Sequence, residues 1–80
     1  MKKNVLILGA SGDIGSAISR QLSKEGYSLI LHYHQNKESI DTLMKQLDEQ
    51  TVLQTVQADL RKSEEVHRLC KNIYFPVYAV

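Results

Sequence analysis

The sequence has one cysteine, one proline, no tryptophan and no surplus of either charge. The single cysteine, Cys70, cannot form an internal disulfide, so the fold must depend on its apolar core. Ten basic residues against nine acidic ones give a formal charge of +1. Because the basic residues form no block, we predict no nucleic-acid partner.

Long hydrophobic runs are also lacking. The apolar run that begins at Val5 ends at Gly9, which is too short for a signal-peptide core or a membrane span. We therefore predict a cytoplasmic protein without a membrane partner. Residues 74–80 have the pattern of a further buried strand with nothing after it to cover it, which suggests the first part of a longer protein or a truncated product.

Apolar periodicity predicts strands that alternate with single helices. The strands are expected at residues 5–8, 28–33, 52–57 and from 74 onward, and the helices over residues 14–26, 40–47 and 63–73. This alternation implies right-handed crossovers and a parallel sheet, whose ligand crevice lies at the carboxyl ends of the strands. The sequence therefore predicts an α/β fold.

Each predicted helix carries one apolar stripe that should face the sheet. We interpret Cys70 as a small core residue of the third stripe rather than a reactive thiol. The stripes are Ile14, Ala17, Ile18 and Leu22; Ile40, Leu43, Met44 and Leu47; and Val66, Leu69, Cys70 and Ile73.

The most informative motif runs from Gly9 to Gly15 and reads G-A-S-G-D-I-G. A buried strand that turns sharply into a helix gathers unpaired N–H groups and the positive end of the helix dipole, where a pyrophosphate fits. We expect Gly9 to make the turn, Gly12 to let the backbone approach the phosphates and Gly15 to allow close helix–strand contact. Ser11 can hydrogen-bond the loop or a phosphate. A purely structural turn is the alternative, but the position of the motif favours a dinucleotide site.

Residues 5–15 resemble the opening strand and T-G-x-x-x-G-x-G loop of the short-chain dehydrogenase/reductase family, and the similarity covers the whole chain. Within this family, the sequence resembles the 3-oxoacyl-acyl-carrier-protein reductases and their relatives, including the reductase that acts on modified elongation factor P. The resemblance implies a nicotinamide cofactor and a Rossmann-type doubly wound parallel sheet. Residues 1–80 would form the N-terminal part of this dinucleotide-binding domain, with the order β-α-β-α-β-α-β and an incomplete sheet.

Two residues depart from the family pattern. Leu8 stands where the family usually has threonine, and Asp13 takes the place of the middle glycine. The resulting G-x-x-G-x-x-G spacing also occurs in extended and atypical branches of the family. Beside a pyrophosphate Asp13 is electrostatically unfavourable, but at a helix start we expect it to cap free N–H groups while its carboxylate points to solvent.

The end of the second strand should select between the two nicotinamide cofactors, because an acid there binds the ribose hydroxyls of NAD and repels a 2′-phosphate. Tyr33 holds the usual acid position, and no acid follows until Glu38. His34, Asn36 and Lys37 can donate hydrogen bonds to a phosphate, so we favour NADP(H) over NAD(H), with a solvated loop as the alternative.

The resemblance adds a second segment to the site. Ala58-Asp59-Leu60 resembles the family's third-strand segment, whose acid usually contacts the adenine ring. The predicted cofactor-binding residues are Gly9, Ser11, Gly12, Asp13, Ile14, Gly15, Tyr33, His34, Asn36, Asp59 and Leu60.

Two spacings that suggest other chemistry are interpreted as structural. His32 and His34 lie on one face of a strand, but no third ligand for a metal is evident. Tyr33 and Lys37 match the family's catalytic Tyr-x-x-x-Lys, in which the phenol acts as general acid. Because Tyr33 stands at the adenosine end of the expected fold, we assign no catalytic residue.

The sequence thus predicts the cofactor-binding part of an NADP(H)-dependent reductase that transfers hydride to a small-molecule or carrier-bound carbonyl. The family's catalytic Ser, Tyr and Lys would lie beyond Val80, so we predict no turnover by this chain alone. The resemblance implies a homo-oligomer for a full-length protein. The alternatives are a non-catalytic dinucleotide sensor, an epimerase-like atypical member of the family, and an α/β interaction domain of flavodoxin-like order that binds no dinucleotide.

Overall fold

The computed structural model describes residues 4–47, 50–73 and 77–79, and these form one sheet with helices on both sides. The predicted alternation of strands and helices is confirmed. The strand expected from residue 74 onward is found at 77–79, and residues 74–76 and 80 lie outside the described residues. None of the described helices is long and apolar enough to cross a membrane. The elements are β1 (Asn4–Ile7), α1 (Asp13–Lys24), β2 (Ser28–Tyr33), α2 (Lys37–Gln46), β3 (Val52–Gln57), α3 (Ser63–Asn72) and β4 (Val77–Ala79).

The strands are parallel and lie in the order β3-β2-β1-β4. The chain moves outward from β1 to β2 and β3, and then returns to the other side of β1. This is the doubly wound Rossmann order, and its reversal between β1 and β4 marks the crevice where ligands bind in such sheets. A flavodoxin-like order, in which β1 lies between β2 and β3, is thereby ruled out.

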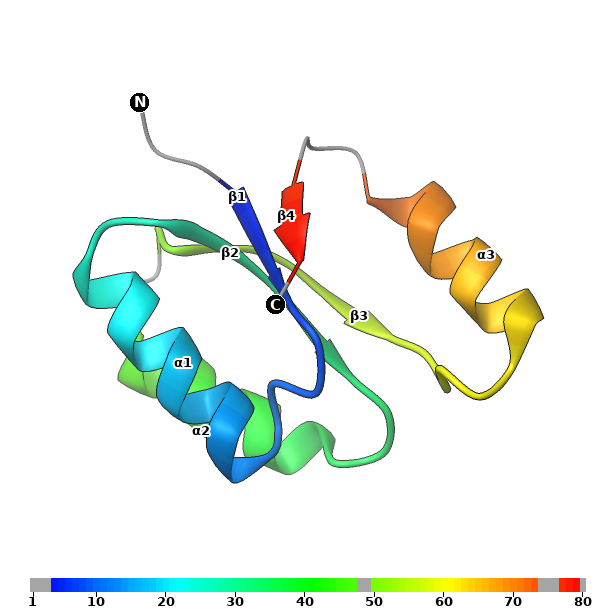
Figure 1. The fold of residues 1–80 in the computed structure, drawn as a ribbon. Helices are drawn as coiled ribbons and strands as arrows, with labels where there is room; N and C mark the ends of the chain where they lie inside the picture. The colour runs from blue at the N-terminus through cyan, green and yellow to red at the C-terminus, as the bar shows by residue number, and fades with distance from the viewer. Residues whose placement is uncertain (1–3, 48–49, 74–76, 80) are drawn as a thin grey trace.

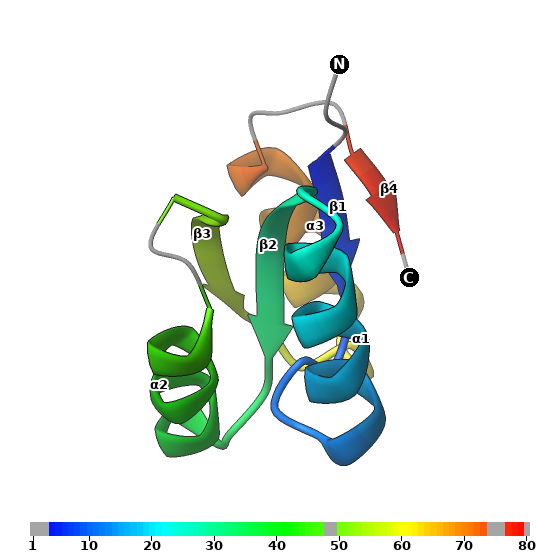
Figure 2. The ribbon, with the colours of Figure 1, turned by 90° about the vertical axis from the view of Figure 1, so that its left-hand side faces the viewer.

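The helices cover opposite faces of the sheet, with α1 and α2 on one side and α3 on the other (Figures 1 and 2). Alternate residues of the central strands supply the two cores, because successive side chains of a strand point to opposite faces. Ile7 and Leu31 pack toward α1 and α2, whereas Leu6 and Ile30 pack toward α3. Burial on both faces explains the continuous apolar runs of β1 and β2.

The inward face of α1 differs from the predicted stripe. Ile14 is 78% exposed and Ala17 is also exposed, whereas Gly15 and Ser19 are buried. Small residues let the helix approach the sheet closely, and the Ser19 hydroxyl is satisfied because it donates to the Gly15 carbonyl at 2.8 Å. The prediction is confirmed for Ile18 and Leu22, which pack against the core, and is wrong for Ile14 and Ala17.

The stripe of α2 is confirmed at Ile40, Leu43 and Leu47, which are buried. Met44 lies at the margin of that stripe and is 37% exposed.

Two further residues predicted to be buried are exposed. Cys70 is exposed, because Leu69 faces the core from α3 and Cys70 lies about 100° further around the helix. Leu8 is 39% exposed, since β1 ends at Ile7 and Leu8 already belongs to the following turn.

We expect Leu31→Ala to destabilise the fold by about 2–5 kcal/mol, because Leu31 is fully buried in the centre of the sheet. Leu53→Ala on the neighbouring strand is the matched control, since Leu53 is 40% exposed and its truncation should cost less than about 1 kcal/mol. Urea denaturation measures both values. Equal losses in the two variants would contradict this placement of the core.

Candidate functional site

The turn after β1 depends on Gly9, whose φ of +66° lies in the left-handed region that favours glycine. Its N–H donates to Nδ1 of His32 at 3.0 Å, and the next N–H, of Ala10, donates to the His32 carbonyl at 2.8 Å. The Gly12 N–H donates to the Gly9 carbonyl at 3.1 Å. Gly9 makes the turn, as predicted, whereas its contact with a cofactor stays a prediction.

Gly15 and Gly12 are glycines for different reasons. A Cβ on Gly15 would lie 2.9 Å from Cα of Ala10 and closer still to the Gly9 carbonyl oxygen, so α1 meets the loop with no room for a side chain. A Cβ on Gly12 would meet only the Gly9 carbonyl, at an ordinary 3.5 Å. The protein itself therefore does not require glycine at position 12, and the role predicted for Gly12 remains a prediction about a ligand.

The loop leaves several N–H groups unpaired at the N-terminus of α1. The first helical hydrogen bond runs from the Ser16 N–H to the Gly12 carbonyl at 2.9 Å. The preceding N–H groups point out of the helix at the positive end of its dipole, which favours an anion. Within the described part of the chain, the N–H groups without a protein acceptor here are those of Ser11, Asp13, Ile14 and Gly15.

The capping role predicted for Asp13 is wrong. Gly12 occupies the N-cap position, and no side chain caps α1 there. Asp13 lies one residue further into the helix, where its carbonyl accepts a hydrogen bond from the Ser16 hydroxyl at 3.1 Å. Its side chain is exposed, as expected, so its charge still interacts favourably with the helix dipole.

Two clefts flank the loop, and their volumes of about 540 and 420 Å³ fall in the range of small-ligand sites. The second brings Ser11 together with Asn36 between α1 and α2. The first is lined by Ile7, Leu8, Gly9, Gly12, Asp13, Ile14, Gly15 and Ile18, and the second by Ser11, Asp13, Ser16, Arg20, Asn36, Glu38, Ser39, Thr42, Leu43 and Gln46.

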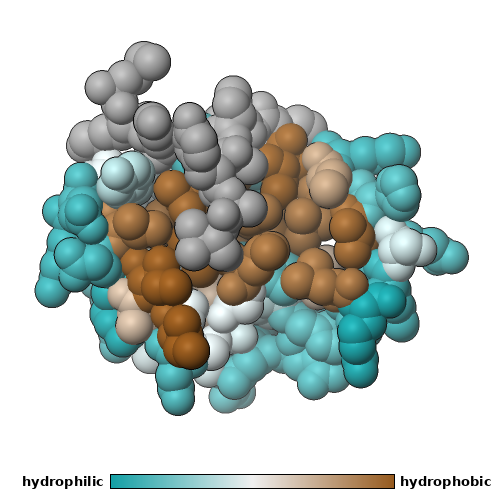
Figure 3. All heavy atoms as spheres, viewed as in Figure 1, coloured by the Kyte–Doolittle hydropathy of each residue, from teal (hydrophilic) through white to brown (hydrophobic). Residues whose placement is uncertain are grey.

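Apolar surface is also present at this end of the molecule. Leu8, Ile14 and Leu60 each follow the carboxyl end of a strand and are 39%, 78% and 43% exposed. The carboxyl edge of the sheet therefore offers both polar N–H groups and apolar contacts. A second apolar surface lies on the side of the molecule where β4 forms the edge of the sheet, where hydrophobic side chains gather in the middle of the view and hydrophilic ones lie at its margins (Figure 3).

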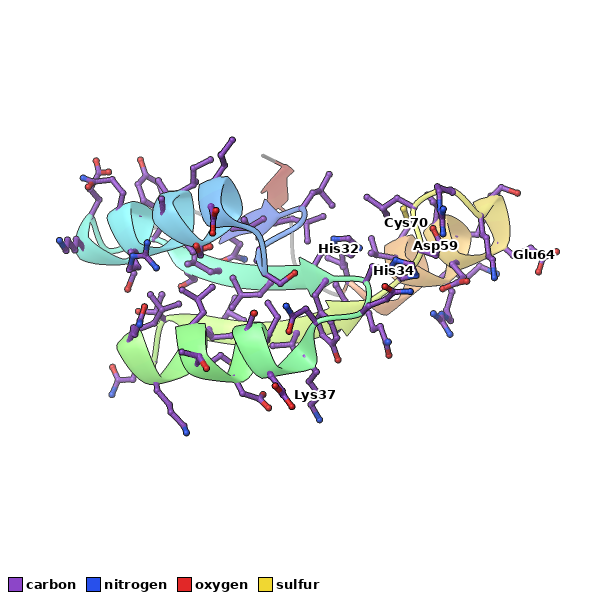
Figure 4. All side chains as sticks on the ribbon, turned by 90° about the horizontal axis from the view of Figure 1, so that it is seen from below. His32, His34, Lys37, Asp59, Glu64 and Cys70 are labelled. Carbon is purple, nitrogen blue, oxygen red and sulfur yellow. The ribbon has the colours of Figure 1, made fainter. Side chains whose placement is uncertain are left out.

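Asp59, after β3, is buried and tightly paired. Oδ1 accepts from the N–H and Nε of Arg61 at 3.0 Å, and Oδ2 accepts from Nη2 of Arg61 at 3.0 Å. These bonds, the side-chain ones first, hold the pKa of Asp59 well below its usual range. His34 adds a smaller Coulombic contribution; its Nε2 lies 3.6 Å from Oδ2, and Figure 4 shows the two side chains together.

The segment around Asp59 is held in place through its backbone as well. The Asp59 N–H donates to Oε1 of Glu65 at 3.0 Å, and the Asp59 carbonyl accepts from the Lys62 N–H at 3.0 Å. The structure thus brings together His34 and Asp59, two of the residues predicted for the cofactor site.

No carboxylate lies at the end of β2. Tyr33 ends the strand and is only 9% exposed, with its side chain packed in the core beneath α1 and α2. Asn36 caps α2, since its Oδ1 accepts from the Ser39 N–H at 3.1 Å. Lys37 begins α2 and points away from His34 and Asp59 (Figure 4). Tyr33 and Lys37 therefore lie on different elements rather than on one helix.

The sequence missed two residues of this region. His32 was interpreted only as a strand residue, and no spacing along the chain indicates that it bonds Gly9. Arg61 could have been found from the Asp-x-Arg spacing, which suits a turn closed by an ion pair. Over residues 4–47, 50–73 and 77–79 there is no group of three His, Cys, Asp or Glu side chains that could hold a metal ion.

A parallel sheet in this order, with a glycine turn at its reversal and free N–H groups on the following helix, defines the nucleotide-binding part of a Rossmann fold. The family model of the short chain dehydrogenases matches residues 3–76, and the chain belongs to this family of oxidoreductases, which use a nicotinamide cofactor.

Individual relatives agree with this assignment. The oxidoreductase YmfI of Bacillus subtilis is 37% identical over 100% of this chain and 34% of that protein. The 3-oxoacyl-[acyl-carrier-protein] reductase FabG of Staphylococcus epidermidis is 31% identical over 91% of this chain and 30% of that protein. The crystal structure of a short-chain dehydrogenase/reductase from Vibrio parahaemolyticus, 20% identical, superposes with a TM-score of 0.82 over 95% of this chain and 36% of its own. The chain spans about a third of the length of these relatives.

We expect Gly15→Ala to destabilise the protein by about 1–3 kcal/mol, because the added methyl group would overlap the loop backbone. Gly12→Ala is the matched control and should change stability by less than about 1 kcal/mol, since its methyl group would make only an ordinary contact. Thermal and urea unfolding report both effects. The close approach of α1 to the loop would be refuted by a Gly15→Ala variant as stable as the wild type.

The Asp59–Arg61 pair predicts a pH-dependent contribution to stability. Because the folded-state pKa of Asp59 is lowered, the contribution is present above the ordinary carboxyl pKa of about 4 and is lost as the pH falls below it. Arg61→Gln should therefore be less stable than the wild type at neutral pH, and the difference should shrink in acid. Urea titrations across this pH range measure it.

Arg20→Gln is the control for this experiment. Arg20 contacts the neutral side chain of Gln46 at 3.3 Å, so its removal should give a difference that does not follow carboxyl titration. If the effect of Arg61→Gln were the same at neutral and acid pH, Asp59 would not be the group responsible.

Proposed function

We propose that residues 1–80 form the N-terminal part of a dinucleotide-binding domain that holds NADP(H) in a carbonyl-reducing oxidoreductase. The observation that carries the proposal is the set of unpaired N–H groups at a turn that Gly9 and Gly15 permit, namely those of Ser11, Asp13, Ile14 and Gly15. A pyrophosphate supplies the acceptors that these donors lack.

The residues present suit such a ligand. No side chain or backbone atom of the protein fills the space beside Cα of Gly12, so the backbone can approach the phosphate oxygens there. Asp13 and Glu38, which line the cleft with Ser11 and Asn36, are the unfavourable elements, because their carboxylates carry the same sign of charge as the ligand. Their exposure keeps these charges in water, where the repulsion is weak.

The adenosine half is assigned to the ends of β2 and β3. The cleft that contains Ser11 and Asn36 adjoins the loop and receives the ribose and its 2′-phosphate. Nδ2 of Asn36 is left to donate, since Oδ1 is used by the Ser39 N–H. His34, whose side chain is 41% exposed, adds a donor at the end of β2, while Asp59 and Leu60 lie on the adenine side. Lys37 points away from His34 and is not counted among these donors. Together with the missing acid at Tyr33, these donors favour NADP(H) over NAD(H).

When bound, the nicotinamide supplies a hydride to a carbonyl carbon. The residues of this chain bind and orient the dinucleotide, and none is assigned to proton transfer. The family's Ser, Tyr and Lys are expected beyond Val80, so the chain alone should not turn over. The name of FabG specifies an acyl-carrier-bound 3-oxo group, which makes a carrier-bound or small-molecule carbonyl the proposed substrate class. Homo-oligomerisation and a cytoplasmic location stay predictions.

A non-catalytic dinucleotide sensor is the second candidate. The G-x-x-G-x-x-G spacing created by Asp13 favours it, because this spacing departs from the usual pattern of the family. The two candidates share the dinucleotide and differ in the downstream sequence, where a Ser followed by Tyr-x-x-x-Lys identifies the reductase.

We predict that NADPH binds more tightly than NADH and that Asn36→Asp reverses this order. Aspartate keeps the acceptor that caps α2 but adds a carboxylate beside the 2′-phosphate, so the Kd of NADPH should rise about tenfold or more while that of NADH changes little. Isothermal titration of both nucleotides measures the change.

Asn4→Asp is the matched control, because it adds the same charge by the same change at the amino end of β1, and Asn4 lines neither cleft. That position lies about 10 Å along the strand from its carboxyl end, beyond a Debye length of about 8 Å in physiological salt. Its NADPH affinity should equal that of the wild type. The dinucleotide proposal is wrong if the wild-type chain binds neither nucleotide, and the NADP preference is wrong if NADH binds more tightly.

A further inference from the structure

We propose that His32 is a positioning residue for the dinucleotide. In this proposal its imidazole ties the glycine turn to the segment that follows β3, so that the phosphate-binding and adenine-binding parts of the site are held at a fixed spacing. The inference rests on the proposed function, but the contacts that carry it are independent of any ligand.

The hydrogen bonds of His32 define one ring state. Nδ1 lies 3.0 Å from the Gly9 nitrogen, and a backbone N–H can only donate, so Nδ1 accepts and carries no proton. Nε2 lies 2.9 Å from the Ala58 carbonyl oxygen, which can only accept, so Nε2 carries the proton. The partners therefore assign the neutral Nε2–H tautomer.

The ring is well placed to control geometry. The His32 residue is only 3% exposed, so water does not readily replace either partner. His32 also accepts the Ala10 N–H through its own carbonyl, and two consecutive N–H groups of the turn are thus held by one residue. With Gly15 packed against the Gly9 carbonyl on the other side, this fixes the direction in which Ser11 and the first N–H groups of α1 point.

The second partner extends the tie to β3. The Ala58 N–H donates to the Tyr33 carbonyl at 3.1 Å while the Ala58 carbonyl accepts from His32. Asp59 and Leu60 follow directly. Since the sheet order is β3-β2-β1, one imidazole on the middle strand bridges the carboxyl ends of both neighbours. Figure 4 shows His32 near His34 at the end of β2. Because the residue is buried and both ring nitrogens are taken up by Gly9 and Ala58, His32 is not itself expected to touch the ligand.

Two substitutions separate the two hydrogen bonds. The amide oxygen of asparagine falls near the place of Nδ1, so His32→Asn keeps the acceptor for Gly9 and loses the bond to Ala58. The amide nitrogen of glutamine falls near the place of Nε2, so His32→Gln keeps the donor to Ala58 and loses the Gly9 bond. His32→Leu removes both, and His67→Leu on the exposed side of α3 is the control.

Isothermal titration with NADPH tests the proposal on folded variants, checked by their amide NMR spectra. Because the tie needs both hydrogen bonds, the Kd should rise at least about tenfold for His32→Leu, His32→Asn and His32→Gln, and less than about threefold for His67→Leu. The Gly9 amide resonance should keep its wild-type position in His32→Asn and move in His32→Gln, which a general loss of packing would not produce. Wild-type affinity in the asparagine or the glutamine variant overturns the proposal.

A measurement on the wild type covers the case in which a variant does not fold. Nitrogen-15 spectra of the His32 ring should show a protonated Nε2, an unprotonated Nδ1 and a coupling across the hydrogen bond to the Gly9 N–H. A protonated Nδ1 overturns the proposal. If the wild type binds neither NADPH nor NADH, the proposed function fails together with this inference, whereas binding that is indifferent to His32 defeats the inference alone.

Discussion

The close contact between Gly15 and the Gly9 carbonyl is the constraint on which the candidate site depends. It brings the start of α1 directly over the end of β1, and it is possible only because Gly15 carries no side chain there; Gly9 is needed for its positive φ. With the helix in this position, the unpaired N–H groups of its first turn lie at the edge of the sheet instead of facing open solvent. The contact of Gly15 with the Gly9 carbonyl thus determines where the positive end of the α1 dipole lies relative to the turn at Gly9.

The polar groups at this edge of the sheet are arranged by charge. On the β1 side there are backbone donors without acceptors, which favour an anion. On the β3 side the acid Asp59 has its acceptors filled by Arg61, so it presents a neutralised pair rather than a free carboxylate. His32 lies between the two sides, buried and uncharged in the tautomer that its partners require. The carboxyl edge of the sheet therefore favours an anion on the β1 side and presents neutralised or uncharged groups toward β3.

The order and type of the elements could be predicted from the sequence, because buried parallel strands and amphipathic helices leave strong periodic patterns. The turn at Gly9 could be predicted for a similar reason, since its conformation follows from the residue type. The inward face of α1 could not, because Gly15 and Ser19 are selected by closeness of approach and not by hydrophobicity. The exposure of Cys70 could not be predicted either, because a shift of one residue around α3 turns a side chain from the core toward solvent.

The polar contacts were the least predictable part of the site. The bond between His32 and Gly9 joins residues 23 positions apart, and nothing in either local pattern indicates it. Asn36 was predicted as a phosphate donor, but its second use, as the cap of α2, depends on where that helix begins. Such contacts depend on which strands become neighbours in the sheet, and the periodicity of a single sequence does not show this.

The placement of β1 in the sheet has a consequence for folding. Its register joins Asn4 to Ser28 on one side and to Val77 on the other, so the second pairing closes almost the whole chain into a ring. Closing a long loop costs entropy that grows with its length, and contacts of this range form slowly. During synthesis, β1 can pair with β2 long before its other edge is occupied. Until that late pairing is made, the hydrogen-bonding groups along the free edge of β1 remain available to foreign strands, which makes the nascent chain most vulnerable to misassociation at the strand that later lies at its centre.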